Sequence, residues 1–327
     1  MKKSRLVCIT PVENIPLIKD KLSESFEVTH LPDATEEDLI SLNKVEKSET
    51  EFIFTNPNRT KIYLNQNIHK YFPNLKVICT ASTGTVHIDE KYFLAHGVKI
   101  LSLKPIIKKM DDVTSTAELA FCFLLNSIRN ISSATTDVNE GNWDCEKFIG
   151  RQVSELTIGV IGYGRLGRAF TRYCNGMGGK IIVYDPFIKR LQDSDLLKIY
   201  ESLQDLIKQS DVISLHASIN KSSIKIINKN SLSDAKENLI ILNTARGELV
   251  NEIDLAEFLY LNKDAKYCTD VLANETDRKN SDIFNYSKYQ EIKERILITP
   301  HIGGMSNYSR KRAYNLAVDQ LKEFIEK

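Results

Sequence analysis

Short apolar runs rich in valine, isoleucine and leucine recur from one end of the chain to the other, and helical patterns separate them. The runs of strand length are residues 6–10, 52–55, 76–81, 99–103, 156–162, 180–185, 211–216, 239–244, 266–271 and 295–299. Such continuously apolar runs are typical of strands covered on both faces, because crossover helices bury both sides of a parallel sheet. The alternation therefore predicts an α/β protein built from doubly wound parallel sheets.

The length and two predicted helices indicate how these strands are divided. At roughly 150 residues per domain, 327 residues suggest two domains. A helix predicted over 113–129, with Ser115 and Glu118 at capping-box spacing, would separate a first α/β unit from a second that begins near Leu156. A last helix is predicted over 307–326. Its apolar face, which core packing would bury, holds Tyr314, Ala317, Val318, Leu321, Phe324 and Ile325.

The charge balance and the apolar pattern exclude several kinds of partner. Basic and acidic residues number 44 and 43, and this net charge of +1 gives no reason to expect nucleic acid or a membrane surface. The longest apolar stretch, 119–125, is far shorter than the roughly 20 residues of a membrane helix. The six cysteines, none spaced as Cys-x-x-Cys, are interpreted as small buried thiols rather than metal ligands or disulfides. Together with the lack of a signal-peptide pattern, they favour a reducing, cytoplasmic compartment.

A glycine-rich motif is the strongest local signal. Gly162, Gly164 and Gly167 form G-x-G-x-x-G at the end of a predicted strand and the start of a predicted helix. The first glycine permits a tight turn, the second lets a pyrophosphate approach the backbone, and the third allows close packing of helix on sheet. Phosphates would then meet the N–H groups of the helix N-terminus. The alternative is an ordinary glycine-rich turn.

The acidic residue that follows the next strand gives this motif its context. Asp185 lies near the expected offset of about 20 residues from the fingerprint. A carboxylate at that position accepts hydrogen bonds from ribose hydroxyls and repels a 2′-phosphate, which predicts NAD over NADP. Lys189 and Arg190 lie just downstream and could weaken that preference.

Three segments with reactive side chains each follow a predicted strand. They are residues 243–250, 270–275 and 299–306. Because ligands bind beyond the carboxyl ends of parallel strands, Arg246, Asp270, Glu275 and His301 are predicted to face one site. Each has a plainer interpretation: Arg246 could pair with Glu248, Glu275 could be a solvated loop carboxylate, and His301 could be a packing histidine.

Taken in order, these motifs resemble the D-isomer-specific 2-hydroxyacid dehydrogenase family, which includes D-3-phosphoglycerate dehydrogenase. The matching stretches are 81–89, 115–120, 141–143, 159–167, 215–216, 243–250, 270–275 and 299–304. The resemblance implies a flavodoxin-like substrate domain, 1–103 with 298–327, and a Rossmann NAD-binding domain inserted at 104–297. It also implies a homodimer formed through the 113–129 region.

The resemblance further implies that Arg246, Glu275 and His301 correspond to the family's catalytic residues, and their chemistry suits hydride transfer to a 2-oxo acid. His301 can donate a proton to the forming alkoxide, because histidine changes charge near neutral pH. Glu275 can orient the ring and favour its charged form. Arg246 offers a planar fork of donors to a carboxylate. The nicotinamide carries the redox chemistry.

By the same resemblance, two further sets of residues would bind ligands. The NAD set is Gly162, Gly164, Arg165, Leu166, Gly167, Asp185, Thr116, His216, Ala217, Thr244, Ala245, Arg246, Asp270, His301, Gly303 and Gly304. In that set Asp270 would face the nicotinamide carboxamide, and His216 is interpreted as a packing or adenosine contact. The substrate set is Ser82, Thr83, Gly84, Thr85, Arg246 and Arg59. His87, which follows the first loop, is interpreted as structural, and no metal site is expected.

Two other functions stay open at this point. One is a non-catalytic, NAD-sensing protein on the same fold, similar to the corepressors that resemble this family. The other is a different NAD enzyme, such as a formate dehydrogenase, although those have Gln where this chain has Glu275. Thr276 replaces a frequent proline, and the polar stretch after it leaves the identity of the 2-hydroxy acid open.

Overall fold

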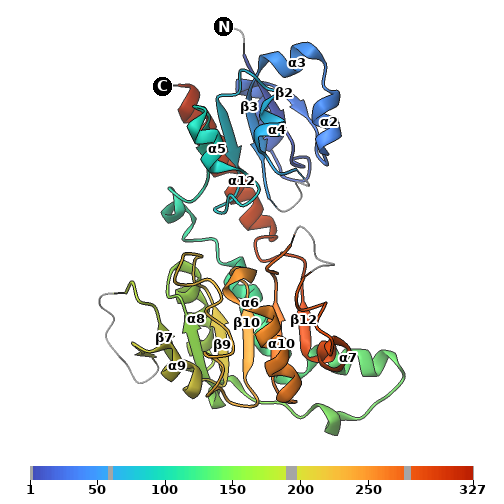
Figure 1. Ribbon diagram of the computed structural model, residues 1–327, viewed down its shortest axis with the longest axis vertical. Helices are drawn as coiled ribbons and strands as arrows, with labels where there is room; N and C mark the ends of the chain where they lie inside the picture. Colours follow the sequence, from blue (N-terminus) through green and yellow to red (C-terminus); the bar gives the residue numbers. More distant parts are fainter. Residues whose placement is uncertain (1–2, 58–61, 189–196, 276–280, 327) are drawn as a thin grey trace. The chain divides into compact units, whose positions relative to one another are not determined.

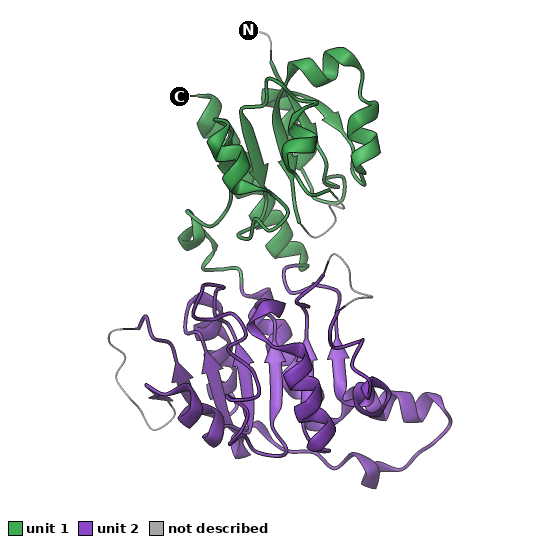
Figure 2. Cartoon of the chain, in the orientation of Figure 1, with its two compact units in different colours: residues 1–113, 305–327 green, residues 114–304 purple. Residues whose placement is uncertain are grey.

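The computed structural model describes residues 3–57, 62–188, 197–275 and 281–326, and the chain forms two compact units. Unit 1 comprises residues 1–113 and 305–327, and unit 2 comprises residues 114–304 (Figure 2). The predicted boundaries, 103/104 and 297/298, are corrected to these. The first boundary moves because Met110 and Val113 pack in the core of unit 1. The second moves because the segment after the last strand hydrogen-bonds to Asp270 of unit 2.

Unit 1 is built on a five-stranded parallel sheet in the order β2-β1-β3-β4-β5, as the predicted flavodoxin-like fold requires. Its strands are β1 (Ser4–Cys8), β2 (Phe26–His30), β3 (Thr50–Thr55), β4 (Val77–Thr80) and β5 (Lys99–Leu101) (Figure 1). Its helices are α1 (Ile18–Ser25), α2 (Glu36–Ser41), α3 (Lys44–Glu49), α4 (Gln66–His69), α5 (Glu90–Ala95) and α12 (Asn307–Ile325), with a 3-10 helix at Ile107–Met110. Leu6 and Cys8 pack with α1 and α12, whereas Val7 and Ile9 pack on the opposite face, so both faces are buried.

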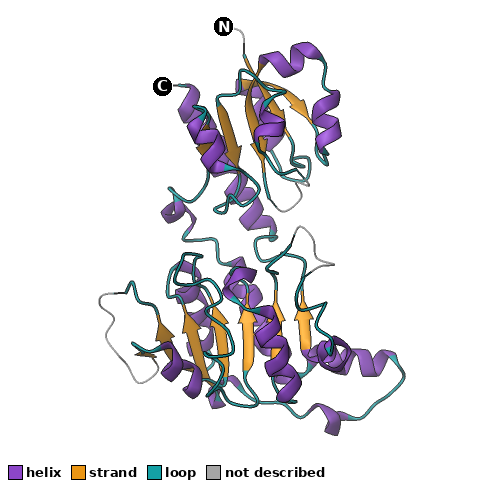
Figure 3. Cartoon of the chain, in the orientation of Figure 1, coloured by secondary structure: helices purple, strands orange, loops and turns teal. Residues whose placement is uncertain are grey.

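Unit 2 is built on a seven-stranded parallel sheet in the order β12-β11-β10-β9-β6-β7-β8, which contains the Rossmann strand order. Its strands are β6 (Thr157–Ile161), β7 (Lys180–Tyr184), β8 (Leu197–Ile199), β9 (Val212–Leu215), β10 (Ile240–Asn243), β11 (Lys266–Thr269) and β12 (Ile296–Ile298). Its helices are α6 (Ser115–Arg129), α7 (Ile131–Asn139), α8 (Arg165–Gly176), α9 (Leu203–Gln209), α10 (Glu252–Leu261) and α11 (Tyr289–Ile292). Short 3-10 helices lie at Cys145–Phe148, Val153–Glu155, Gly247–Leu249 and Lys293–Arg295. In Figure 3 helices flank the strands of this sheet, and two apolar clusters fill the space between the layers.

All ten predicted strands form, but β2 and β8 were not predicted from the sequence. Both lie at an edge of their sheet. An edge strand has one neighbour and needs less apolar surface: most residues of β2 and all three of β8 are only partly buried or exposed. Their sequences therefore lack the continuous apolar run that identified the central strands.

Two local predictions need correction. The capping box at Ser115 does not form: Thr114 is the N-cap of α6 and donates to Glu118, while the Ser115 hydroxyl donates to the Gly303 carbonyl at 2.7 Å. The six cysteines are all free, as interpreted, but Cys122 and Cys145 are exposed rather than buried. No helix within the described residues is long and apolar enough to cross a membrane.

Candidate functional site

The turn between β6 and α8, residues 162–167, is here called the glycine turn. Gly162 has a φ of +90°, and a Cβ there would lie 2.5 Å from the Ala217 nitrogen. A Cβ on Gly167 would lie 2.2 Å from the Gly162 carbonyl oxygen. The backbone cannot move aside at either position, because the sheet and α8 hold it on both sides. The predicted roles of tight turn and close packing thus have a direct steric cause.

Gly164 differs from its two neighbours, since a Cβ built on it meets nothing within 4 Å. Packing therefore does not explain this glycine, and open space lies where a pyrophosphate is expected to approach. Gly164 is the N-cap of α8, a 12-residue helix that opens with Arg165 and Leu166. The N–H groups of such a terminus favour a phosphate, so the glycine turn fits a dinucleotide.

Asp185 follows β7 and is bound to the glycine turn. Its carboxylate accepts hydrogen bonds from the backbone N–H of Tyr163 at 2.8 Å and of Phe187 at 2.9 Å. The carboxylate is thereby held beside the turn, with remaining lone pairs for ribose hydroxyls. Lys189 and Arg190 lie outside the described residues.

His216 lies beneath the glycine turn and is kept neutral. Its Nε2 lies 2.8 Å from the Ser214 hydroxyl, and its ring packs on Phe170 with centroids 5.1 Å apart. Burial lowers the pKa of His216 to about 3. The neighbouring Ala217 backbone lies against Gly162. His216 therefore supports the turn as a packing group.

A second turn, residues 299–303, follows β12 and is here called the histidine turn. His301 has a φ of +56°, a left-handed conformation that costs an L-residue roughly 1–2 kcal/mol. Its Nδ1 lies 2.8 Å from a Glu275 carboxylate oxygen, and both side chains are partly exposed, 33% and 40%. Since a carboxylate only accepts, Nδ1 carries the proton, and Nε2 is left for another partner.

Asp270 fixes the shape of the histidine turn. One carboxylate oxygen accepts from the Thr299 hydroxyl at 2.5 Å and the Ile302 N–H at 2.7 Å. The other accepts from the Gly303 N–H at 2.7 Å. Asp270 is 2% exposed, and its carboxylate binds Thr299 on one side of His301 and Ile302 and Gly303 on the other. The predicted contact of Asp270 with the nicotinamide carboxamide stays a prediction. The sequence did not reveal that Asp270 also holds the histidine turn.

Thr116 and Gly303, both assigned to the NAD site, lie together. A Cβ on Gly303 would come within 3.1 Å of the Thr116 methyl carbon and 3.0 Å of Asp270, whereas one on Gly304 would meet nothing within 4 Å. The Thr244 hydroxyl, after β10, is buried and has no hydrogen-bond partner among the described residues. An unpartnered buried hydroxyl beside the strand ends fits a polar ligand such as the nicotinamide end of NAD.

Arg246 lies in the same loop, two residues beyond Thr244. Its guanidinium donates to the Ala245 carbonyl at 2.6 Å, and the Asn243 side chain donates to the Arg246 carbonyl at 2.9 Å. At Gly247 a Cβ would lie 1.9 Å from the carbonyl carbon of Leu272. The Arg246 loop therefore packs directly on the backbone that leads to Glu275.

The predicted carboxylate loop, residues 82–85, belongs to unit 1. The Ser82 hydroxyl donates to the Gly84 carbonyl at 2.6 Å, and Thr80 bridges Ser82 at 2.8 Å and His87 at 3.1 Å. His87 is buried, which lowers its pKa to about 4 and keeps it neutral, as its structural interpretation requires. Arg59 lies outside the described residues.

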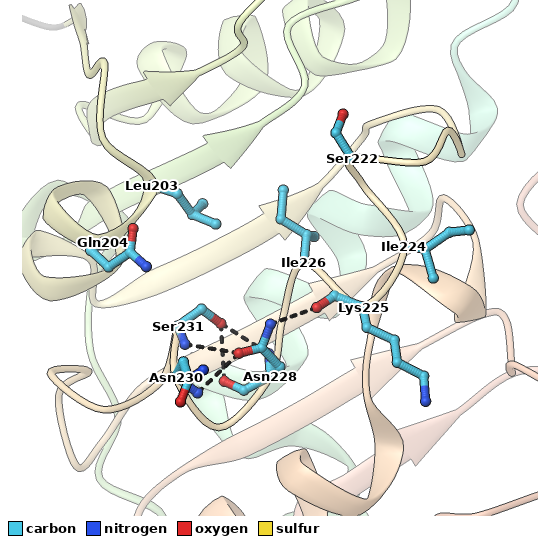
Figure 4. A pocket seen from close by; sticks show the side chains of 9 residues that line it. All are labelled: Leu203, Gln204, Ser222, Ile224, Lys225, Ile226, Asn228, Asn230 and Ser231. Carbon is cyan, nitrogen blue, oxygen red and sulfur yellow. Dashed lines mark hydrogen bonds between the residues drawn. The ribbon is translucent and has the colours of Figure 1, made fainter.

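A separate pocket of about 320 Å³ lies in unit 2 between α9 and residues 222–231 (Figure 4). The Asn228 side chain donates to the Lys225 carbonyl and accepts from the N–H groups of Asn230 and Ser231. The polar groups here hold one another, and no predicted site residue lines this pocket.

The glycine turn fits a dinucleotide, and the histidine–glutamate pair at the strand ends is chemically able to transfer a proton, a combination typical of dinucleotide-dependent α/β enzymes. Comparison with known proteins identifies the family. The NAD binding domain of the D-isomer specific 2-hydroxyacid dehydrogenases matches residues 121–303. The chain belongs to this family, whose members are NAD-dependent oxidoreductases.

Relatives and solved structures agree. A hydroxypyruvate reductase of Thermotoga maritima is 32% identical over 73% of this chain and 74% of that protein. A D-3-phosphoglycerate dehydrogenase of Methanocaldococcus jannaschii is 30% identical over 77% of this chain, which spans only 46% of that protein. The structure of a D-lactate dehydrogenase from Aquifex aeolicus, complexed with NAD and lactic acid, is 28% identical, with a TM-score of 0.77 over 98% of this chain and 95% of that one.

Proposed function

We propose that this chain reduces a small 2-oxo acid to its 2-hydroxy acid with NADH, and that His301 donates the proton. The observation that carries the proposal is the 2.8 Å contact between His301 Nδ1 and Glu275. With Nδ1 engaged, Nε2 is the nitrogen that would give a proton to the substrate oxygen and take it back in the reverse direction.

Glu275 and Arg246 complete the proposed machinery. Glu275 would orient the His301 ring by accepting a hydrogen bond from its Nδ1. Arg246 would hold the substrate carboxylate through its planar fork of N–H donors. When bound, the nicotinamide supplies the hydride that the protein itself cannot provide.

The proposed NAD contacts follow from the fit described above. The glycine turn and the first turn of α8 would bind the pyrophosphate, and Asp185 the adenosine ribose. His216 and Ala217 would border the adenosine, and Thr116, Thr244, Ala245, Asp270, Gly303 and Gly304 would surround the nicotinamide.

Within the family, we favour hydroxypyruvate or glyoxylate as the substrate over a phosphorylated acid. The support is sequence identity: the hydroxypyruvate reductase of Thermotoga maritima is 32% identical to this chain, against 30% for the D-3-phosphoglycerate dehydrogenase of Methanocaldococcus jannaschii. The loop at 82–85 and Arg59 remain the proposed substrate contacts from the N-terminal region.

The test is NADH oxidation by purified protein against glyoxylate, hydroxypyruvate, phosphohydroxypyruvate, pyruvate, 2-oxoglutarate and branched-chain 2-oxo acids. His301→Ala should lose at least about 100-fold in kcat, because general acid catalysis contributes 10²–10⁴-fold. His96→Ala, a change at an exposed histidine outside the proposed site, serves as the control. Tight NADH binding without turnover on any acid would instead favour an NAD-sensing protein.

We also propose that two copies assemble and that they do so in the cytoplasm. Exposed apolar side chains gather in α7 and the segment after it: Ile131 is 51% exposed, Trp143 90% and Ile149 75%. Seven residues of α6, Phe123 and Leu124 among them, are buried within unit 2, so the second copy would cover α7 rather than the whole predicted 113–129 region. Light scattering at low concentration should give twice the mass of 37.2 kDa, and a Trp143→Ser variant should dissociate more readily.

The six free thiols support a reducing compartment.

A further inference from the structure

A buried glutamate outside the proposed machinery binds both ends of the segment that carries Glu275. Glu252 is the first residue of α10 and is only 2% exposed. One carboxylate oxygen accepts from the Ala273 N–H at 3.0 Å. The other accepts from the Ser281 hydroxyl at 2.6 Å and from the Ile283 N–H at 3.3 Å.

Core packing does not account for a carboxylate at this position. A charged side chain taken out of water costs free energy unless hydrogen bonds replace its hydration. Here three donors replace the hydration of the Glu252 carboxylate. Ala273 lies at one end of the 273–283 segment, and Ser281 and Ile283 lie at the other. Ser281 is itself 1% exposed, so this contact is shielded from solvent.

Glu275 lies two residues beyond Ala273, within the segment that Glu252 closes. It is 40% exposed, and among the described residues it contacts His301 Nδ1 at 2.8 Å and the Leu272 N–H at 3.4 Å, so few interactions within this part of the chain fix its position. From the other side, the backbone of Leu272 and Ala273 packs against Gly247, beside Arg246. The approach of Glu275 to His301 thus depends on where Ala273 is held.

We propose that Glu252 is a positioning residue that holds Glu275 against His301 by binding both ends of the 273–283 segment. The inference rests on the proposed pairing of Glu275 with His301 in catalysis. Glu252 itself touches neither the substrate nor the cofactor in this proposal, and it acts through Glu275.

Glu252→Gln is the sharpest variant because it keeps the number and arrangement of the non-hydrogen atoms. The amide has one accepting oxygen, so its NH₂ group must face the backbone N–H of Ala273 or of Ile283, because only the Ser281 hydroxyl among the three partners can accept instead of donating. That end is released and Glu275 loses its fixed position. Glu257→Gln, on the same helix, is the matched control, because the Glu257 side chain is 44% exposed and its carboxylate lies 3.8 Å from the Lys229 ammonium.

The first measurement is the protonation pattern of the His301 ring by NMR at mildly alkaline pH, with isotope-labelled histidine and signals assigned through His301→Gln. The wild type and Glu257→Gln should carry the proton on Nδ1, and Glu275→Ala should shift it to Nε2. Glu252→Gln should move toward the Glu275→Ala pattern. A wild-type pattern in Glu252→Gln would overturn the proposal.

The second measurement is a double-mutant cycle in kcat/KM. Glu252→Gln should lower kcat/KM about tenfold alone, as misplacement of a catalytic group does, and very little in the Glu275→Ala background. Losses that multiply would show that Glu252 acts independently of Glu275, contrary to the proposal. If the wild type reduces no 2-oxo acid, the proposed function fails while the NMR pattern still decides the role of Glu252. Should Glu252→Gln not fold, Ser281→Ala removes one donor and should shift both readouts in the same direction by less.

Discussion

The two turns at the carboxyl edge of the unit 2 sheet both use a left-handed backbone, but for different reasons. In the glycine turn, Gly162 at +90° has the residue type that this conformation prefers, and its neighbours leave no room for a side chain. In the histidine turn, His301 at +56° has a residue type that resists the conformation, and Asp270 holds the backbone there through three hydrogen bonds. One turn is specified by its own residues, and the other by a carboxylate from a neighbouring strand end.

The largest effect should follow a change in the glycine turn. Gly167→Ala places a Cβ 2.2 Å from the Gly162 carbonyl oxygen, and two backbone segments cannot separate without moving α8. We expect unfolding to become easier by about 3 kcal/mol or more, at the upper end of overpacking costs. Urea denaturation measures this change.

Gly164→Ala sharpens the contrast within the same turn. Its Cβ meets nothing within 4 Å, so the stability should change by less than about 0.5 kcal/mol, while NADH affinity should fall about tenfold or more because the pyrophosphate loses its close approach. Equal destabilisation by both alanines would contradict the steric account.

This difference explains what the sequence could predict. The glycine turn was identified residue by residue, because its three glycines form a motif of fixed spacing at the end of a strand, and Gly162 and Gly167 leave no room for a Cβ. The left-handed His301 and the support from Asp270 were not foreseen, because nothing in a Thr-Pro-His sequence marks a positive φ. Glu252 was missed for the same reason: its donors lie 21 to 31 residues further along the chain.

The same reasoning covers the secondary structure. Central strands such as β6 and β10 were predicted because burial on two faces requires a continuous apolar run. The partly buried edge strands β2 and β8 were missed because polar residues interrupt them, Glu27 in β2 and Lys198 in β8, whereas the edge strand β12 is partly buried too but keeps the apolar run Ile-Leu-Ile. The capping-box spacing of Ser115 and Glu118 did not identify the cap, because the Ser115 hydroxyl reaches Gly303, 188 residues away, and this partner is visible only in the folded unit.

The next largest effect should come from Asp270→Asn in the histidine turn. The amide group that replaces one carboxylate oxygen must face an N–H of Ile302 or Gly303, so one of the three hydrogen bonds is lost and a donor is left unpaired. We expect a loss of about 2 kcal/mol in stability and a lower kcat. An Asn variant with wild-type stability and activity would mean that the turn keeps its shape without the carboxylate.

Acid should weaken the glycine turn through His216. Its pKa is lowered by burial from 6.5 to about 3, so between these values the unfolded chain binds a proton that the folded chain does not. Stability is therefore unaffected above pH 6.5 and falls below it, by up to about 2 kcal/mol between pH 7 and pH 5. His216→Gln should flatten this slope in urea titrations at the two pH values, and His96→Gln at an exposed position should not. Burial also lowers the pKa of His87 in unit 1, so part of the loss of stability with falling pH should remain in His216→Gln.

The smallest effect tests the strain in the histidine turn directly. If the +56° φ of His301 costs free energy, glycine at this position should relieve the cost and alanine should not. We expect His301→Gly to be about 1 kcal/mol more stable than His301→Ala, with His301→Asn between them, because asparagine tolerates the left-handed region better than alanine. All three should lack the proton donor, so urea midpoints separate backbone strain from the loss of catalysis. Equal midpoints for the three variants would show that Asp270 holds the turn at no cost, and the two turns would then differ in residue type but not in energy.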